Sequence, residues 1–224
     1  MRKAVLHLKK ADPVLRAIIE RVGPCRMTFR EPTFHSLARA IAYQQLNGKA
    51  ALTIFNRLAA LAGDPLTPEG ILKLTPEQMR AVGLSKQKSS YLLDMADRAH
   101  RGELNFSRVL TMSEDEVIEH LTQVKGVGVW TAHMFLMFTL QRPNILPTGD
   151  FGIRMAMFKH YLDKRSAGNG STQTAKTSAR KLKTRKITLP TPAQMEKIAK
   201  AWAPYRSIAC WYLWRSLDVN TPAN

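Results

Sequence analysis

The carboxylate of Asp150 lies at a position in the sequence that suits a catalytic role. Asp150 follows a turn-forming segment rich in Pro and Gly, from Pro143 to Gly149, and precedes a stretch with helical periodicity that runs from Phe151 to about Leu162. A carboxylate held at such a junction can stabilise positive charge that develops on a substrate, or it can orient or deprotonate an attacking water. It can equally cap the following helix, and the residue taken alone favours the cap.

A second feature with chemical use is a Gly-x-Gly turn at Gly126 and Gly128. The pattern predicts that one helix ends near Val124 and that a second helix, running through Phe138, begins just after the turn. Backbone amides at such a helix start point outward and form a phosphate site, which the helix dipole strengthens. The residues expected to form this phosphate-binding hairpin are Gly126, Val127, Gly128 and Thr131. Taken alone, the turn is explained as well by two packed helices.

The charge of the chain points to a polyanionic partner. Among 224 residues, 34 are basic and 17 are acidic, which gives a formal net charge of +17. Folding does not require such an excess, and nucleic acid is the leading candidate partner. An anionic membrane surface is the second candidate, but no strongly basic helix with a broad apolar face is visible.

Helices are predicted through most of the chain, and the fold class is predicted to be all-α. Helix starts are marked by capping boxes that begin at Thr75, Ser113 and Thr191. Segment 26–30 is the only weak strand candidate, and we do not assign it as a strand. The basic segment 164–187 contains few apolar residues, and we interpret it as a flexible surface loop.

These motifs occur together in the pattern of a known superfamily. The run V-K-G-V-G-V-W-T-A at 124–132 resembles the helix-hairpin-helix motif of DNA glycosylases, and P-T-G-D-F-G-I-R at 147–154 resembles the loop that carries their essential Asp. Three further segments resemble the same proteins, namely 34–51 with its Q-Q-L-N turn, 83–92 and 202–209. The chain therefore resembles the helix-hairpin-helix glycosylases, and most of all the 3-methyladenine DNA glycosylase II (AlkA-like) family, from about Asp12 to Leu217.

The resemblance implies a two-lobed helical fold, with a DNA-binding cleft between the lobes, within a single domain that spans 1–224. The central lobe would cover about 34–145 and include the hairpin at 121–140. The second lobe would combine the N-terminal segment with about 146–217, and the basic loop would occupy 164–187.

The resemblance also implies a reaction. Asp150 would be the catalytic residue that promotes hydrolysis of the N-glycosidic bond of an alkylated purine flipped out of duplex DNA, leaving an abasic site. The expected substrates are 3-methyladenine and 7-methylguanine, which carry positive charge and need no general acid to leave. Related bifunctional enzymes place a lysine just after the hairpin glycines, where this chain has Trp130. A monofunctional enzyme without strand cleavage is therefore expected.

The same comparison assigns further site residues. A methylated base would stack on an aromatic pocket, and a side chain after the first helix of the central lobe would enter the gap that the flipped base leaves. The expected pocket residues are Trp130, Phe151, Trp214 and Met134. The expected wedge residues are Leu46 and Gln45.

No cofactor is expected to be required, but the family's hairpin holds a monovalent cation through backbone carbonyls. The matching carbonyls here are those of Thr122, Val124 and Val127, which would hold Na⁺ or K⁺. The expected partner is double-stranded DNA with alkylated bases, bound by a monomer, with no membrane association. The start of the chain, Met1 to Lys10, lacks the features of a signal peptide, so we expect a protein that is not secreted and that acts in the bacterial cytoplasm or nucleoid, or in a eukaryotic nucleus.

Three alternatives remain open at the level of sequence. A non-catalytic helix-hairpin-helix module would explain the charge and the hairpin, but not Asp150, Trp130 and the Q-Q-L-N turn together. A glycosylase for oxidised or mismatched bases would usually carry the lysine, or the four cysteines of an iron–sulfur cluster, whereas this chain has two cysteines. An RNA-binding protein fits the charge alone.

Overall fold

The computed structural model describes residues 1–46, 48–163 and 188–218. Within these residues the chain forms helices joined by turns and contains no β-strand, so the predicted all-α class is confirmed. Segment 26–30 is irregular, and the amide of Arg30 donates to the carbonyl of Phe138 at 2.9 Å. The predicted basic loop at 164–187 lies outside the described residues. None of the helices in the described part of the chain has the length and apolar character needed to cross a membrane.

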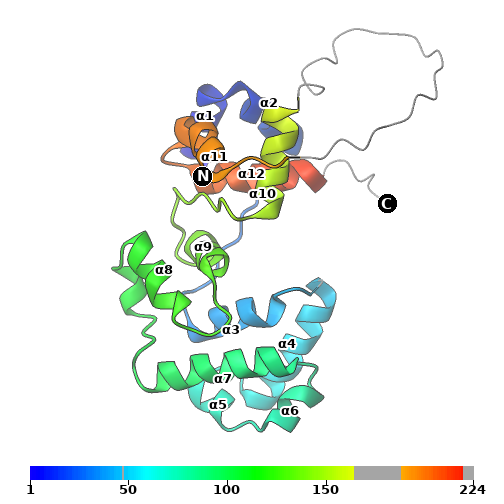
Figure 1. Cartoon of the computed structure of the whole chain (residues 1–224), viewed down its shortest axis with the longest axis vertical. Coiled ribbons are helices and arrows are strands. Elements are labelled where there is room, and N and C mark those ends of the chain that lie inside the picture. The colour runs from blue at the N-terminus through cyan, green and yellow to red at the C-terminus, as the bar shows by residue number, and fades with distance from the viewer. Residues whose placement is uncertain (47, 164–187, 219–224) are drawn as a thin grey trace, which may run out of the picture. The chain divides into compact units, whose positions relative to one another are not determined.

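The chain divides into two compact units. Unit 1 combines Met1–Met27 with the chain from Pro143 onward, and unit 2 is Thr28–Arg142. Figure 1 shows the first and last helices of the chain side by side within unit 1. Two segments from opposite ends of the sequence therefore share one core.

Unit 1 is built around its last helix. Its helices are α1 (Arg2–Ala11), α2 (Pro13–Val22), α10 (Phe151–Met157) with a π-helical extension (Phe158–Leu162), α11 (Pro192–Ala199) with a 3₁₀ turn (Lys200–Trp202), and α12 (Arg206–Asp218). α12 packs against both α2 and α10. Its residues from Ser207 to Leu213 are all buried, so little of its surface faces water.

A buried carboxylate ties the ends of unit 1 together. Asp12 caps α2 through its Oδ1, which accepts from the amides of Val14 and Leu15. Its Oδ2 accepts from the hydroxyl of Tyr161 at 2.9 Å and from Nε1 of Trp202 at 2.7 Å. Four donors compensate for the loss of water around this charge.

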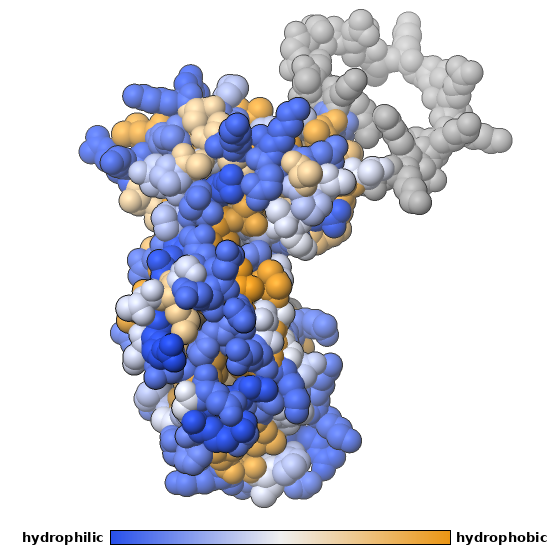
Figure 2. Space-filling view, turned by 60° about the vertical axis from the view of Figure 1, so that its left-hand side comes forward, coloured by the Kyte–Doolittle hydropathy of each residue, from blue (hydrophilic) through white to orange (hydrophobic). Residues whose placement is uncertain are grey.

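Unit 2 carries the predicted hairpin. Its helices are α3 (Phe34–Tyr43), α4 (Gly48–Ala62), α5 (Pro68–Leu72), α6 (Pro76–Ala81), α7 (Lys86–His100), a 3₁₀ turn (Arg108–Leu110), α8 (Glu114–Thr122) and α9 (Val129–Phe138). α7 packs against α3, α5 and α6, while α8 packs against α9. In Figure 2 the visible face of this unit, in the lower part of the picture, is mostly hydrophilic.

The helix starts follow the capping signals of the sequence. The boxes at Thr75, Ser113 and Thr191 are all formed, with each hydroxyl accepting from the third helical amide and the Gln or Glu side chain bonding back to the cap. Such caps fix where a helix begins. The box at Ser113 thus sets the start of α8, the first helix of the hairpin.

Candidate active site and nucleic-acid interface

Asp150 is a buried carboxylate held by two donors. Its side chain is at the start of α10, and only 8% of the residue is exposed. Oδ1 accepts from the backbone amide of Ile153 at 2.8 Å and from the indole Nε1 of Trp214 at 2.9 Å. Asp150 is therefore the N-cap of α10, and the indole bond is a contact that a cap does not require. The two bonds together fix the orientation of the carboxylate.

The loop before Asp150 is anchored to the start of α12. Ser207 donates its amide to the carbonyl of Pro143 at 2.9 Å, and its hydroxyl accepts from the amide of Ile145 at 3.0 Å. A further turn bond joins the Asp150 amide to the carbonyl of Pro147 at 2.9 Å. The segment 202–209, which the sequence marks as a family motif, thus fixes the loop that presents the carboxylate.

Gly152 leaves room for the bond between Trp214 and Asp150. A Cβ at Gly152 would lie 2.9 Å from Cδ1 of Trp214 and 3.2 Å from Oδ1 of Asp150. Any larger residue would push the indole away from the carboxylate. Phe151, the neighbour of Gly152, is 66% exposed and so is available for contact with a ligand.

The hairpin in unit 2 has the predicted form. α8 ends at Thr122, Gly126 adopts a left-handed φ of 77°, and α9 begins after Gly128, which provides no side-chain cap. Amides in the first turn of a helix have no acceptor within the helix, so those of Gly128 and Thr131 suit a phosphate. The N–H of Val127 instead donates to the carbonyl of Val124 at 3.0 Å and closes the turn.

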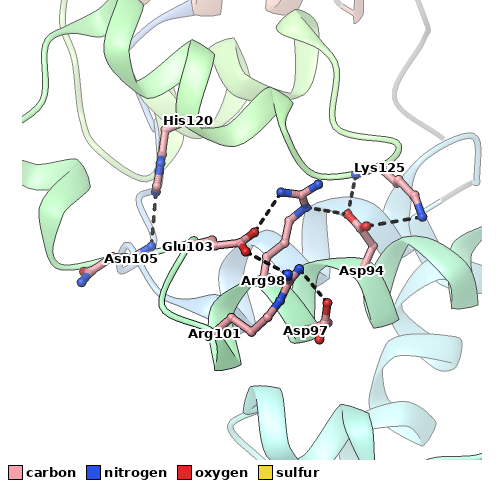
Figure 3. A network of polar contacts seen from close by, with 8 residues as sticks. All are labelled: Asp94, Asp97, Arg98, Arg101, Glu103, Asn105, His120 and Lys125. Carbon is pink, nitrogen blue, oxygen red and sulfur yellow. Dashed lines mark hydrogen bonds and ion pairs between the residues drawn. The ribbon is translucent and has the colours of Figure 1, made fainter.

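A carboxylate on α7 holds the hairpin from below. Oδ2 of Asp94 accepts from the backbone amide of Lys125 at 2.9 Å and from Nε of Arg98 at 3.1 Å, as Figure 3 shows. Nζ of Lys125 lies 3.5 Å from Oδ1 of the same residue. Burial alone would raise the pKa of Asp94, but these donors outweigh it and keep the pKa below its usual value. The carboxylate is thus charged at neutral pH and fixes the loop.

The network continues along α7. Arg98 also pairs with Glu103, and Arg101 joins Glu103 to Asp97, so that alternating charges link the helix to the loop that follows it (Figure 3). These outer pairs are largely exposed and contribute little each. The contact that matters for the hairpin is therefore the bond between the Lys125 amide and Asp94, whose side chain is only 13% exposed.

A family model for the HhH-GPD superfamily, described as base excision DNA repair proteins, matches residues 38–186. The chain belongs to this superfamily. The resemblance inferred from the sequence motifs is therefore confirmed. Residues 38–186 include the hairpin, Trp130 and Asp150.

Relatives with this fold align over almost all of the chain. DNA-3-methyladenine glycosylase 1 of Schizosaccharomyces pombe is 33% identical, with 96% of this chain and 87% of the yeast protein covered. The solved structure of the S. pombe 3-methyladenine DNA glycosylase with abasic DNA matches with a TM-score of 0.76 at 31% identity, covering 99% of this chain and all of that one. A DNA-3-methyladenine glycosidase from Bacillus halodurans matches with a TM-score of 0.74 at 32% identity, covering 95% and 88%.

The predicted site residues of this HhH-GPD protein form two sets, one in each unit. Unit 1 brings Asp150, Phe151 and Trp214 together at the start of α10. Unit 2 carries the hairpin and two further groups described next. Their roles in binding a base or entering the DNA stack stay predictions.

Trp130 and Met134 lie one turn apart on α9. The indole of Trp130 belongs to a residue that is 47% exposed at the second position of the helix. Met134 borders a cavity of about 140 Å³ between α3 and α9, which Arg39 and Tyr43 also line. This exposure leaves the indole of Trp130 accessible to a ligand.

Leu46 and Gln45 lie in the turn between α3 and α4. Leu46 is 40% exposed, and Gln45 adopts a left-handed φ of 56°. A non-glycine residue with positive φ is strained and is often found at functional sites. The wedge position is thus a projecting turn rather than a buried leucine.

Sequence reasoning missed the residues that support these groups. Gln44 was part of the Q-Q-L-N motif but was given no role, although it binds the hairpin. Asp94 and Gly152 were not singled out at all. Gly152 could have been found from its place in P-T-G-D-F-G, whereas Asp94 leaves no signal because its partner is 31 residues away.

Proposed function

We propose that this HhH-GPD protein is a monofunctional DNA glycosylase that removes alkylated purines, above all 3-methyladenine and also 7-methylguanine, and leaves an abasic site. The observation that carries the proposal is the buried Asp150 carboxylate, oriented by Ile153 and Trp214. It is supported by relatives that are named DNA-3-methyladenine glycosylases and align over nearly the whole chain.

The chemistry follows from the position of the charge. Cleavage of the bond between C1′ of the sugar and the base nitrogen leaves positive charge on the deoxyribose ring, which a nearby carboxylate stabilises. Water then adds to C1′ and gives its proton to Asp150, while a cationic methylated base departs as a neutral molecule with the bonding electrons. Because Oδ1 is fixed by two donors, the carboxylate need not reorganise during the reaction.

The aromatic side chains support a preference for cationic bases. Trp130 and Phe151 are large and exposed, and an aromatic face attracts a positively charged ring more than a neutral one. The same charge makes the base a good leaving group. Binding and bond cleavage would therefore favour the same substrates.

The absence of strand cleavage is supported by two observations on lysine. Trp130 stands at the position where lyase enzymes of the superfamily carry a lysine nucleophile. The amine of the nearby Lys125 lies 3.5 Å from the carboxylate of Asp94, so this lysine is paired with α7. We therefore expect intact strands until the abasic site is treated with alkali.

The hairpin and the net charge support duplex DNA as the partner, with the protein acting as a monomer. We also propose that the carbonyls of Thr122, Val124 and Val127 hold Na⁺ or K⁺. In support, Val124 O accepts one bond, from Val127, and a carbonyl has a second lone pair for a cation. A bound ion would neutralise part of the phosphate charge at the hairpin.

The test is release of methylated bases from duplex DNA, comparing the wild type with Asp150→Asn. Asparagine keeps an acceptor for the Ile153 amide, so the helix cap is preserved and only the charge is lost. We expect the wild type to free 3-methyladenine and the variant to lose at least about a thousandfold in rate, by analogy with the loss of a main electrostatic stabiliser.

DNA affinity is the control, because it should be equal in both proteins. If neither protein releases a base while both bind DNA, the chain is a non-catalytic binding module and Asp150 is a helix cap. If strand breaks appear without alkali, the monofunctional assignment is wrong.

A further inference from the structure

One glutamine joins the hairpin to the turn after α3. Gln44 is the first residue after that helix, and its Nε2 donates to the carbonyl of Gly126 at 2.9 Å. The same nitrogen lies 3.4 Å from Oγ1 of Thr131, at the start of α9. Because the Gly126 carbonyl can only accept, the amide nitrogen of Gln44 must face it. The contact links segments that are 82 residues apart in the chain.

The two residues after Gln44 form a turn that is exposed to solvent. Gln45 has a φ of 56°, which reverses the chain, and the amide of Leu46 closes the turn on the carbonyl of Tyr43 at 3.3 Å. Gln45 and Leu46 are exposed, whereas Gln44 is partly covered by the hairpin. A single short segment therefore contains both the exposed residues of the expected wedge and the glutamine that binds the hairpin.

One face of α7 supports both partners of this contact. Nζ of Lys88 donates to the carbonyl of Ala42 at 2.7 Å, at the end of α3. The ring of Tyr91 fills the space beside Gly126, where a Cβ would overlap it. Asp94 binds the Lys125 amide (Figure 3). The three α7 residues are spaced by three, so they lie along one side of the helix and form a rigid base.

We propose that Gln44 is a positioning residue that couples the phosphate-binding hairpin to the wedge turn. With the bond between Gln44 and Gly126 in place, seating the DNA backbone on the hairpin sets how Leu46 enters the base stack. Without it, the hairpin and the turn each keep their own fold, since Asp94, Tyr91 and Lys88 still hold them, but their relative position is looser. The proposal rests on the proposed glycosylase function and goes beyond it by assigning a role to Gln44.

The coupling matters only where a stack must be opened. Flipping a base out of a duplex costs a few kcal/mol of unstacking and unpairing, which a well-placed wedge offsets. A base in a single strand is already accessible. Loss of the Gln44 bond should therefore slow base release from duplex DNA and leave release from single strands almost unchanged.

The experiment compares Gln44→Met with the wild type on methylated duplex and methylated single-stranded DNA. Methionine keeps the length of the side chain and removes the donor. We expect the duplex rate to fall roughly fivefold to tenfold, the change for one hydrogen bond of ordinary strength, and the single-strand rate to stay within about twofold. The ratio of the two rates is independent of how much of the variant is folded.

Gln141→Met is the matched control. Gln141 is an exposed glutamine that follows α9 outside the hairpin, and it makes no side-chain hydrogen bond within the described residues. This change should leave the ratio of duplex to single-strand rates unaltered. Gln44→Glu, which replaces the donor by an acceptor, should reproduce the effect of Gln44→Met.

A double-mutant cycle separates coupling from general damage. In a Leu46→Ala background, Gln44→Met should cost little more, because the wedge that it positions is gone. The proposal is overturned if Gln44→Met lowers both rates equally, or if its effect adds in full to that of Leu46→Ala.

A catalysis-independent readout distinguishes this failure from failure of the proposed function. Fluorescence of 2-aminopurine placed beside an abasic-site analogue reports insertion into the stack. If the wild type releases no base, the glycosylase assignment fails. The coupling is then upheld if Gln44→Met lowers the fluorescence change at saturating protein, and is overturned if it does not.

Discussion

One carboxylate oxygen of Asp150 accepts two hydrogen bonds. Oδ1 caps α10 by accepting from Ile153, and it also accepts from the indole of Trp214. A helix cap needs only the first bond, and substitution of such a cap typically costs about 1 kcal/mol. The second bond brings an aromatic side chain into contact with the carboxylate. The bond between Asp150 and Trp214 therefore supports a functional site more strongly than the burial of the aspartate does.

Replacing Trp214 by Phe tests the contribution of the indole donor. The change keeps an aromatic face and removes the N–H that holds Asp150. A hydrogen bond to a charged group contributes about 1.5–3 kcal/mol, so we expect kcat to fall by roughly 10- to 100-fold. KM should change little, because stacking is preserved. A rise in KM with unchanged kcat would instead place Trp214 in base binding alone.

His160 makes unit 1 sensitive to acid. Its Nε2 lies 2.9 Å from Oγ of Ser216, a buried hydroxyl that itself donates to the carbonyl of Leu213. Nε2 must then be the donor, which the neutral ring satisfies. Burial, with a smaller contribution from Lys159 and Arg21, lowers the pKa of His160 from 6.5 to about 4. The folded state thus disfavours protonation of this ring.

The sign of the effect follows from linkage. Because the pKa is lower in the folded state, His160 contributes stability above a pH of about 6.5, and that contribution is lost as the pH falls towards about 4. Between these values the wild type should therefore lose more of its melting temperature than His160→Asn does. Melting curves of both proteins across this range measure the difference. Parallel losses would show that the ring does not titrate with folding.

The hairpin is the element in which two glycines have different tasks. Gly126 has a φ of 77° and faces the ring of Tyr91, while a Cβ at Gly128 would meet no atom of the described residues within 4 Å. One glycine is thus required by the fold. The other keeps an open approach to the amides at the start of α9.

Alanine at each position should separate these tasks. Gly126→Ala combines a strained backbone with overlap at Tyr91, so we expect a loss of roughly 1–3 kcal/mol in the free energy of unfolding. Gly128→Ala should leave the free energy of unfolding almost unchanged and weaken DNA binding, because its methyl group lies where a phosphate approaches. Denaturant unfolding and DNA titration measure both properties. Equal stability of the two variants would contradict this assignment.

At the level of elements, the sequence predicted features that depend on neighbouring residues, but it did not predict the distant residues that hold the hairpin. The capping boxes and the Gly-x-Gly turn act over a few residues, so they could be recognised from the sequence. Gln44 reaches the hairpin across 82 residues and Asp94 across 31, and nothing in the local pattern encodes such partners.

The ion pairs within the molecule do not neutralise its excess of positive charge. The formal net charge is +17, and the described ion pairs each join one basic group to one acidic group, so they leave this excess unchanged. Positive charge that the fold leaves uncompensated costs stability through self-repulsion and favours association with a polyanion. The hydrophilic face of unit 2 in Figure 2 is consistent with a surface that stays hydrated until DNA displaces its ions.

Counterion release makes this a quantitative expectation. Each phosphate neutralised by the protein contributes a slope of about −0.9 to the plot of log affinity against log salt concentration. We expect a steep slope for undamaged duplex DNA, identical in the wild type and Asp150→Asn, because the Asp150 carboxylate contacts no phosphate in the proposed complex. Removing a single basic contact lowers the magnitude of such a slope by about one.

Gly128→Ala removes no charge, so it should lower the affinity at every salt concentration with a slope close to that of the wild type. Titrations over a range of salt concentrations measure all three. A shallow wild-type slope would mean that the net charge serves some other partner, and a slope altered by Asp150→Asn would place that carboxylate against the DNA backbone.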